Sequence, residues 1–516
     1  MDLSVKLLEP AAWLQKILDQ EGVPCELIKV KKNTELDLSI VAIFSRNIGR
    51  IPSKLIVTNH KALARVLGKK VKSSAASAFI YNGKQGQSYL EVFSVDLREL
   101  NSFQELGHHL DRFGRKIPFS GVILGETAGK QYVSLPWNMS AFPSQWLRWS
   151  LYLTTMRINE RLFCETAPRV DDRLVREVVF EALALGYQRI NAPIVRVSPR
   201  ITGPGYVAIR IDADGHSPLS TDRVAAVSRS TGVQFSWFID TWSWKKESAT
   251  IRELSRFNEI ALHSYFHLTS IWRKSNLRNI RKGLQFLRKQ GVAKGGFVSP
   301  FGHWNPGLRD ALSIEQFSYS SEFALSRDVF PSKTIFRGRS SPLQIPSIPI
   351  SLGVWTGSKN YWSVLHEEIQ LRLDEAGFAV FYDHPLGRLE HQVEKLHSLI
   401  ETISDSGHEF VTLEQLRKII DTRPKIVSVE FVDEEVKYEI EGQESPHFSV
   451  EKIWGKNLQA IPKLDSLGLG IGRQNSFSIA WRKTLFFGLV STIPIGLHIS
   501  WAQIRRLALM FLKDSR

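Results

Sequence analysis

Two histidines and two aspartates stand at spacings that suit a metal ion and its chemistry. His263 and His267 lie four residues apart, and Asp212 and Asp214 lie two apart earlier in the chain. Two imidazoles and one carboxylate are a common ligand set for catalytic zinc, and the fourth position stays open for a water molecule. Either pair by itself is more often structural, since Asp-x-Asp pairs frequently cap turns. The chemistry therefore depends on whether the fold brings the pairs together.

Four short segments share a layout that would bring them together. Each is an apolar strand pattern that ends in polar or metal-ligand residues: Ile211–Gly215, Leu262–His267, Phe297–Gly302 and Phe381–Pro385. In a parallel barrel the carboxyl ends of the strands gather on one face, and active sites form there. Strand and helix patterns alternate over this part of the chain, which is typical of a parallel α/β sheet. Residues far apart in the sequence are therefore expected to meet at one end of the strands.

The order of these segments resembles the polysaccharide deacetylase (NodB-homology) family over residues 206–420. Six parts of the chain are similar to its motifs, in order: Val207–Gly215 to the opening strand and aspartate motif, Gly232–Ile239 to the second strand, His263 with His267 to the His-x-x-x-His motif, Ser299–Gly302 to the end of the Arg-Pro-Pro-Tyr-Gly motif, His384 to the late histidine, and Phe410–Leu416 to the closing segment. The resemblance implies an α/β fold, a distorted (β/α) barrel of NodB-homology type.

The resemblance also implies a role for each matched side chain. Asp214, His263 and His267 would bind one divalent metal ion, most commonly zinc. Asp212 would act as the general base toward the attacking water, and His384 as the general acid that protonates the leaving amine. Amide cleavage needs both proton transfers, so these roles make chemical sense.

Further candidates follow from the third motif. The backbone N–H of Phe301 would stabilise the oxyanion of the tetrahedral intermediate. Pro300 and Trp304 are the candidate substrate-binding residues. Trp304 could stack on a sugar ring at the rim of the site, or it could be a core tryptophan beside Asn305, which would cap a helix.

The sequence departs from the family pattern at two places. Ala213 separates Asp212 from Asp214, whereas the family usually has adjacent aspartates. The family arginine of the third motif is absent, and Ser299 stands near its place. Because that arginine is thought to orient the base, its loss leaves three alternatives: an altered substrate, a replacement from elsewhere such as Arg210, or weak activity.

By pattern, the chain divides into five segments. They are an N-terminal α/β domain of unknown role at 1–165, a helix and linker at 166–205, the deacetylase-like domain at 206–420, a small C-terminal β appendage at 421–475, and an apolar, basic tail at 476–516. Local patterns predict strands over 38–44, 54–58 and 121–125, a helix around Ala62–Leu67, a helix over 173–185 that ends at Gly186, and a hairpin of 425–432 with 436–440.

Length and composition limit the class of protein. The chain has 516 residues, 43% hydrophobic and 23% charged, which favours two to four globular domains. It has only two cysteines, Cys25 and Cys164, and no basic region followed by an apolar run at its beginning. We therefore expect a reducing compartment, the cytoplasm, and read no secretory signal.

The charge and the tail suggest what the protein binds. The formal net charge is +15, which suits an anionic substrate, an anionic membrane surface or nucleic acid. Nucleic acid is least favoured, because no zinc-finger spacing or RNA-binding signature occurs. Residues 484–500 carry no Asp, Glu, Lys or Arg, but Pro494 and two glycines interrupt them. A re-entrant or interfacial segment at the cytoplasmic face of a membrane fits better than a clean span, and a buried helix is the alternative.

These observations lead to one function and two alternatives. The expected function is a metal-dependent hydrolase that removes an N-acetyl group from a sugar of a cell-surface polysaccharide or its precursor. Lipid-linked or nucleotide-linked precursors would suit the basic chain, since both carry phosphates. The first alternative keeps the metal site in an amidase that acts on a non-sugar C–N bond. The second is a non-catalytic carbohydrate-binding or scaffold protein.

Overall fold

The computed structural model describes most of the chain up to residue 454. The described residues are 1–8, 11–28, 39–44, 53–82, 84–87, 91–97, 102–111, 113–137, 172–199, 203–215, 217–270, 272–302, 304–322, 330–333, 335–336, 339–348, 361–442 and 445–454. They form two compact units. Unit 1 takes the described residues within 1–143, 169–200 and 422–471, and unit 2 those within 201–421.

Unit 1 is built on two sheets with helices. The larger sheet has the order β2 (Cys25–Leu27), β1 (Val5–Leu7), β3 (Ile40–Ala42), β4 (Leu55–Asn59), β12 (Lys130–Leu135), β11 (Val122–Thr127) and β8 (Phe103–Leu106). The smaller one has the order β10 (Lys116–Ile117), β9 (His108–Asp111), β5 (Val71–Tyr81) and β6 (Lys84–Gln87), with β7 (Glu91–Val95) also paired to β5. Its helices are α1 (Ala12–Glu21), α2 (His60–Val66) and α5 (Asp172–Arg189). The α/β class and the strands expected near 38–44, 54–58 and 121–125 are confirmed.

One local expectation in unit 1 is wrong. Helix α5 does not end at Gly186 but continues to Arg189. A Cβ atom at Gly186 would lie 3.0 Å from methyl groups of both Leu55 and Val133. The glycine is therefore a close-packing residue that lets α5 approach β4 and β12, and it does not act as a helix stop.

The grouping of segments differs from the five-part division. Strand β13 (Ile194–Pro199) pairs antiparallel with β25 (Phe448–Ile453) over its whole length. The expected hairpin is confirmed as β23 (Lys425–Val432) with β24 (Glu435–Glu441). The linker and the C-terminal β segment therefore belong to unit 1, because these main-chain hydrogen bonds join residues far apart in the sequence.

Unit 2 is a parallel sheet with helices, and its strands lead around a ring. Strand β14 (Tyr206–Ala213) pairs in parallel with β15 (Ser236–Ile239) and β21 (Phe378–Asp383), and β15 pairs with β16 (Glu259–Leu262). Single parallel bridges then link Leu262 to Phe297 and Phe297 to Ser320. Strand β17 (Tyr319–Ser320) pairs with β20 (Leu343–Gln344), and a bridge from Ile348 to Phe381 returns to β21. β22 (Glu409–Phe410) pairs with the beginning of β14.

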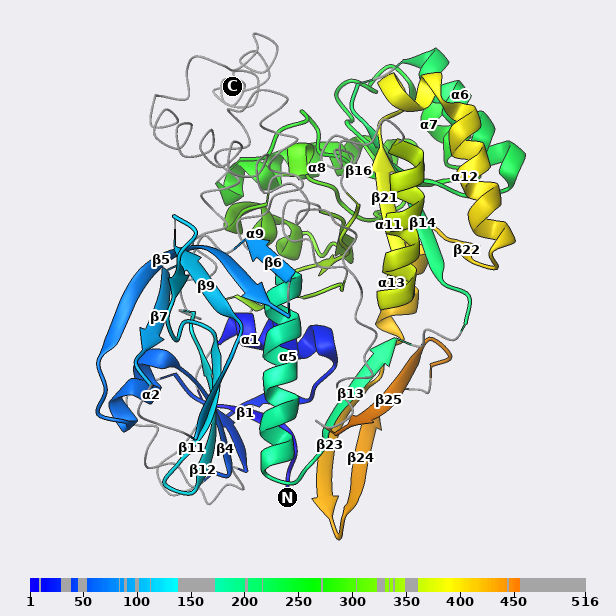
Figure 1. Ribbon diagram of the computed structural model, residues 1–516. Helices are drawn as coiled ribbons and strands as arrows, with labels where there is room; N and C mark the ends of the chain where they lie inside the picture. Colours follow the sequence, from blue (N-terminus) through cyan, green and yellow to red (C-terminus); the bar gives the residue numbers. More distant parts are fainter. Residues whose placement is uncertain are drawn as a thin grey trace, which may run out of the picture. The chain divides into compact units, whose positions relative to one another are not determined.

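Helices connect these strands. They are α6 (Pro218–Thr231), α7 (Ser248–Leu254), α8 (Arg273–Lys289), α9 (Pro306–Ile314), α11 (Tyr361–Ala376), α12 (Val393–Asp405) and α13 (Leu413–Asp421), with the short turns η2 (Pro300–Gly302) and η3 (Pro385–Leu389) and the two-residue strands β18 (Ile335–Phe336) and β19 (Arg339–Ser340). β21 runs beside β14, and α11 lies along β21 (Figure 1). The alternation of strand and helix matches the sequence pattern.

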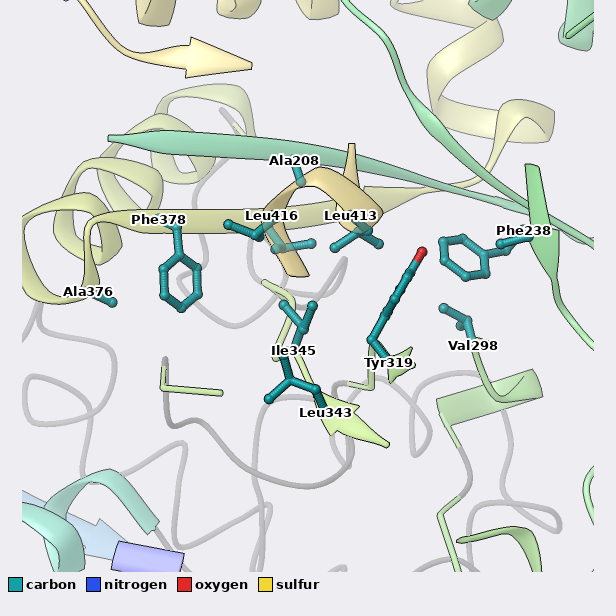
Figure 2. Close-up of a cluster of buried hydrophobic side chains, with 12 residues drawn as sticks. Ala208, Phe238, Val298, Tyr319, Leu343, Ile345, Ala376, Phe378, Leu413 and Leu416 are labelled. Atoms are coloured by element: carbon teal, nitrogen blue, oxygen red, sulfur yellow. The ribbon is translucent and has the colours of Figure 1, made fainter. Parts of the chain in front are cut away.

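A hydrophobic cluster fills the space between these strands. Successive strands each contribute to it, from Ala208 of β14 and Phe238 of β15 to Tyr319 of β17 (Figure 2). Leu413 and Leu416 of α13 point into the same cluster, and both are fully buried. Tyr206, at the beginning of β14, packs against this cluster from its edge.

The structure describes no part of the apolar tail, so the expectation for residues 484–500 lies outside the described residues. Among the residues that are described, no helix is long and apolar enough to cross a membrane.

Candidate metal centre

Asp214, His263 and His267 lie together at the carboxyl ends of the strands. Asp214 directly follows β14, and His263 directly follows β16. The Nε2 atoms of His263 and His267 lie 2.8 and 2.9 Å from Oδ1 of Asp214. Nε2 of His384, which follows β21, lies 3.4 Å from Oδ2 of the same carboxylate. Four side chains from three strands therefore meet, because parallel strands end at one edge.

The donor atoms fit a metal ion. Nδ1 of His263 lies 2.9 Å from the carbonyl oxygen of Val298, which can only accept, so Nδ1 carries the proton and Nε2 presents its lone pair. Nε2 of His263 and Nε2 of His267 are 3.2 Å apart. A tetrahedral zinc ion with bonds of about 2.0–2.1 Å separates its donors by roughly 3.3 Å. Spacing and ligand type both suit a divalent ion held by Asp214, His263 and His267.

The charges at the centre shift the ionisation of Asp214. Burial raises the pKa of Asp214, but the imidazoles of His267, His263 and His384 outweigh burial and hold this pKa well below its usual range. The carboxylate is therefore ionised across the physiological range, which a metal ligand requires.

His267 lies on a curved loop, one of the two geometries that the spacing allows. Its φ is +54°, and Ser264 has a φ of +66°. Such left-handed conformations persist only when neighbours hold them. Asn279 of α8 does so from both sides: it accepts a hydrogen bond from the N–H of Phe266 and donates one to the carbonyl of Leu268, at 3.0 and 2.8 Å.

Trp244 holds the chain on both sides of Asp214. Its indole Nε1 donates to the carbonyl oxygens of Ala213 and Gly215, at 3.2 and 2.9 Å, and the ring is fully buried. Nothing in the local sequence pattern indicated this contact, because the two partners lie about thirty residues away along the chain. Trp244 thus positions a ligand without touching the reacting atoms.

Arg210 holds Asp212 with two hydrogen bonds. Its Nε donates to Oδ1 at 2.8 Å and its Nη2 to Oδ2 at 2.7 Å, and Arg210 is fully buried. Nη1 donates to the carbonyl oxygen of Ser321 and to the hydroxyl of Ser347, at 2.6 and 3.1 Å. The guanidinium also lies over the ring of Tyr382, 4.2 Å from its centroid. Of the three alternatives for the missing arginine, this geometry favours replacement by Arg210.

His384 faces three carboxylates. Burial lowers the pKa of His384, but Asp214, followed by Asp212 and Asp383, outweighs burial and raises it to about 9. Asp383 accepts a hydrogen bond from the backbone N–H of His384 at 2.8 Å. Asp383 therefore fixes the turn that presents the histidine.

The third motif gives a mixed outcome. Pro300 and Phe301 lie in η2, which begins two residues after Val298, whose carbonyl orients His263. The Phe301 side chain lies outside the described residues. Pro300 is buried. Trp304 is only 6% exposed, and Asn305 caps α9 by accepting from the N–H of Leu308 at 2.9 Å. This burial favours the core interpretation of Trp304 over stacking on a sugar at the rim.

Glu322 is a buried carboxyl group beside the third motif that no sequence signal indicated. Its Oε1 accepts hydrogen bonds from the backbone N–H of Ser299 at 2.9 Å and from the hydroxyl of Ser320 at 2.6 Å. Burial raises the pKa of Glu322 to about 8, although these bonds and Arg210 act against it. Glu322 therefore anchors the beginning of η2 as a largely neutral acid at neutral pH.

This shift predicts how stability depends on pH. The folded chain binds the Glu322 proton more tightly than the unfolded chain, where the pKa is near 4.5, so the free energy of unfolding falls as pH rises from about 4.5 towards 8. In Glu322→Gln that loss is absent. Relative to the native protein, we expect the variant to gain about 3 kcal/mol between pH 5.5 and 8.5. Urea unfolding of both proteins at each pH measures this, and a pH-independent difference would contradict it.

Among the comparisons with known proteins, only the comparison with solved structures found similar proteins. No protein-family model matches the chain, and no curated protein matches it. A structure described as a polysaccharide deacetylase from Mycobacterium smegmatis is 19% identical over 43% of this chain and 93% of that one, with a TM-score of 0.37. A family 4 acetyl xylan esterase from Clostridium thermocellum, solved with cobalt, is 16% identical. The match covers 42% of this chain and 91% of that one, with a TM-score of 0.32. A CE4 family pseudoenzyme from Bacillus anthracis is 13% identical. The match covers 42% of this chain and 66% of that one, with a TM-score of 0.31. The solved structures to which this chain is similar are thus polysaccharide deacetylases of the CE4 family and their relatives.

Proposed function

We propose that this protein is a metal-dependent hydrolase that removes the N-acetyl group from a sugar of a cell-surface polysaccharide or of its precursor. One observation carries the proposal: an acid, a base and a three-ligand metal set converge at the carboxyl ends of one parallel sheet. His384 lies 3.4 Å from the metal-ligand carboxylate of Asp214, and Asp212 is the next-to-last residue of β14, two positions before Asp214. Amide hydrolysis requires these three groups together.

The ring of strand pairings supports the finer assignment of the fold. We assign unit 2 to a distorted (β/α) barrel, since its parallel pairings lead from β14 around to β21 and back. In such a barrel the site lies at the carboxyl ends of the strands, where Asp214, His263 and His384 are found.

The chain's own residues divide the proton transfers. A divalent ion, for which we propose zinc, supplies Lewis-acid polarisation of the water and the amide carbonyl when it is bound. Asp212 accepts the proton of the attacking water, and Arg210 fixes the orientation of this carboxylate by donating to both of its oxygens. The Phe301 N–H donates to the oxyanion.

The leaving nitrogen needs a proton when the C–N bond breaks. His384 supplies it, since the neighbouring carboxylates of Asp214, Asp212 and Asp383 raise its pKa and favour the protonated imidazole. The products are acetate and a free amine. We further propose that the reaction takes place in the cytoplasm, at the membrane face, on an anionic lipid-linked or nucleotide-linked glycan precursor that suits the net charge of +15.

Acetate release tests the proposal. The native chain, incubated with zinc and N-acetylglucosamine oligomers, should release acetate, and Asp212→Asn should lower kcat by about a hundredfold or more because the general base is lost. Asp222→Asn, an exposed aspartate on α6, is the matched control and should leave the rate unchanged. Hydrolysis of simple amides in place of acetylated sugars would favour the amidase alternative. Equal rates in the native and Asp212→Asn proteins would reject the assignment of the base.

A further inference from the structure

An open groove lies where helices α8 and α9 begin. Its volume is about 650 Å³, and it is lined by Trp272, Arg273, Lys274, Pro306, Gly307 and Asp310. None of these residues takes part in the proposed chemistry. The groove brings together a tryptophan, two cationic side chains and one carboxylate.

The groove is joined to the metal centre through the loop that carries His267. Ser270 of that loop accepts, through its carbonyl, hydrogen bonds from Asn276 at 2.7 Å and from Asn305 at 3.1 Å, and its N–H donates to Asn276 at 2.8 Å. Trp272 follows His267 by five residues, so their Cα atoms are at most about 18 Å apart. This upper limit is a distance that a glycan a few sugars long can span.

Among the tryptophans whose side chains the structure describes, Trp272 is the most exposed. Its side chain is 61% exposed, although a tryptophan is normally largely buried. An exposed indole presents a flat apolar face with a polar edge, which suits packing against a sugar ring. Most of this side chain therefore faces solvent at the wall of the groove.

The charge at the groove points to an anion. Arg273 and Lys274 stand in the first turn of α8, where no acidic residue occurs and Trp272 provides no side-chain cap. Cations are unfavourable there, because the beginning of a helix carries partial positive charge. Asp310, the one carboxylate among these lining residues, accepts through Oδ1 from Arg309 at 2.8 Å, so the groove keeps an excess of positive charge. Local conflicts of this kind are expected at functional sites, and a bound anion would remove this one.

We propose that this groove binds a phosphate or carboxylate group that the glycan substrate carries a few sugars from the acetylated nitrogen. Arg273 and Lys274 hold the negative charge, and Trp272 packs against the neighbouring ring. The inference rests on the proposed function for the identity of the ligand as a glycan. It adds that the enzyme selects an anionic substrate by a site on α8 separate from the metal centre.

Equilibrium binding tests the groove without turnover. Three N-acetylglucosamine tetramers serve as probes: a neutral one, one with a terminal phosphate, and one with a glucuronate residue. All proteins carry Asp212→Asn so that the probes are not cleaved, and calorimetry measures Kd at low and high salt. We expect one or both anionic probes to bind about tenfold tighter than the neutral one, since charge-assisted hydrogen bonds are the strong ones. The anionic probe that binds more tightly than the neutral one shows whether the groove prefers a phosphate or a carboxylate.

Charge-matched variants distinguish anion binding in the groove from a general attraction of anions to the basic protein. Arg273→Gln/Lys274→Gln should abolish the preference for the anionic probe and leave neutral binding unchanged. Arg288→Gln/Lys289→Gln removes the same charges from the exposed last turn of the same helix and should keep the preference. Trp272→Ala should raise the Kd of all three probes to a similar degree. Equal binding of neutral and anionic probes, or equal losses in the two double variants, would overturn the inference. Anion preference in these binding measurements, together with no acetate release from the native protein, would reject only the proposed function.

Discussion

The double variant His263→Ala/His267→Ala is expected to bind no metal ion, whereas the native protein should hold close to one divalent ion per chain. The two imidazoles supply two of the three ligands, and their Nε2 atoms face the same carboxylate oxygen at 2.8 and 2.9 Å. Asp214 alone cannot retain a catalytic ion, because such sites need three protein ligands. Metal content by mass spectrometry, with acetate release on the same samples, measures both losses.

A matched control keeps this result specific. His391→Ala/His397→Ala removes two histidines that are 71% and 37% exposed in the same unit, and it should keep both metal and activity. If the native protein stays empty after incubation with zinc, the catalytic proposal loses its basis and the binding or scaffold alternative takes its place. Metal retained in the His263→Ala/His267→Ala protein would place the ion elsewhere.

Arg210→Met should be the most destabilising single change near the site. The variant leaves Asp212 buried without its guanidinium, and breaking a buried pair typically costs about 3–5 kcal/mol. The loss should be large because Arg210 is fully buried and bonds both carboxylate oxygens. Denaturant unfolding measures it, and activity should fall together with stability because the base is no longer oriented.

Two further variants separate the charge pair from packing. Arg210→Met/Asp212→Leu removes both charges and should recover much of the lost stability, since apolar replacement of a whole buried pair is often neutral. Arg229→Met, which removes an arginine that is 53% exposed, should change stability little. A stability of Arg210→Met close to that of the native protein would show that Asp212 does not depend on Arg210 when folded.

Three residues of the site were predictable because they follow strand ends in a fixed order. Asp214, His263 and His384 each come directly after a strand pattern, so pattern and placement agree. Arg210 carried a weaker signal: residues two apart on a strand share a face, which places it beside Asp212. Glu322 and Trp244 carried none, because their partners are backbone groups of segments distant in sequence.

The same limit explains what was missed in the fold. Strand and helix patterns are local, and they located β3, β4 and α2 near their observed bounds. The pairing of β13 with β25 is not local, and no pattern in either strand specifies its partner. Gly186 was misread because glycine has two uses, as a helix stop and as a close-packing residue, and only its neighbours Leu55 and Val133 distinguish them.

That pairing has a consequence for how the chain is made. β13 leaves the ribosome about 250 residues before β25, its only described partner along its full length, and all of unit 2 is synthesised in between. Unit 2 can complete its own strand pairings first, since β21 and β22 both precede β25. During that interval the main-chain groups of β13 that await β25 must be shielded by water or by a chaperone. A ribosome that stalls just before residue 448 should therefore hold a folded unit 2 and an unfinished unit 1, which limited proteolysis of the nascent chain would distinguish.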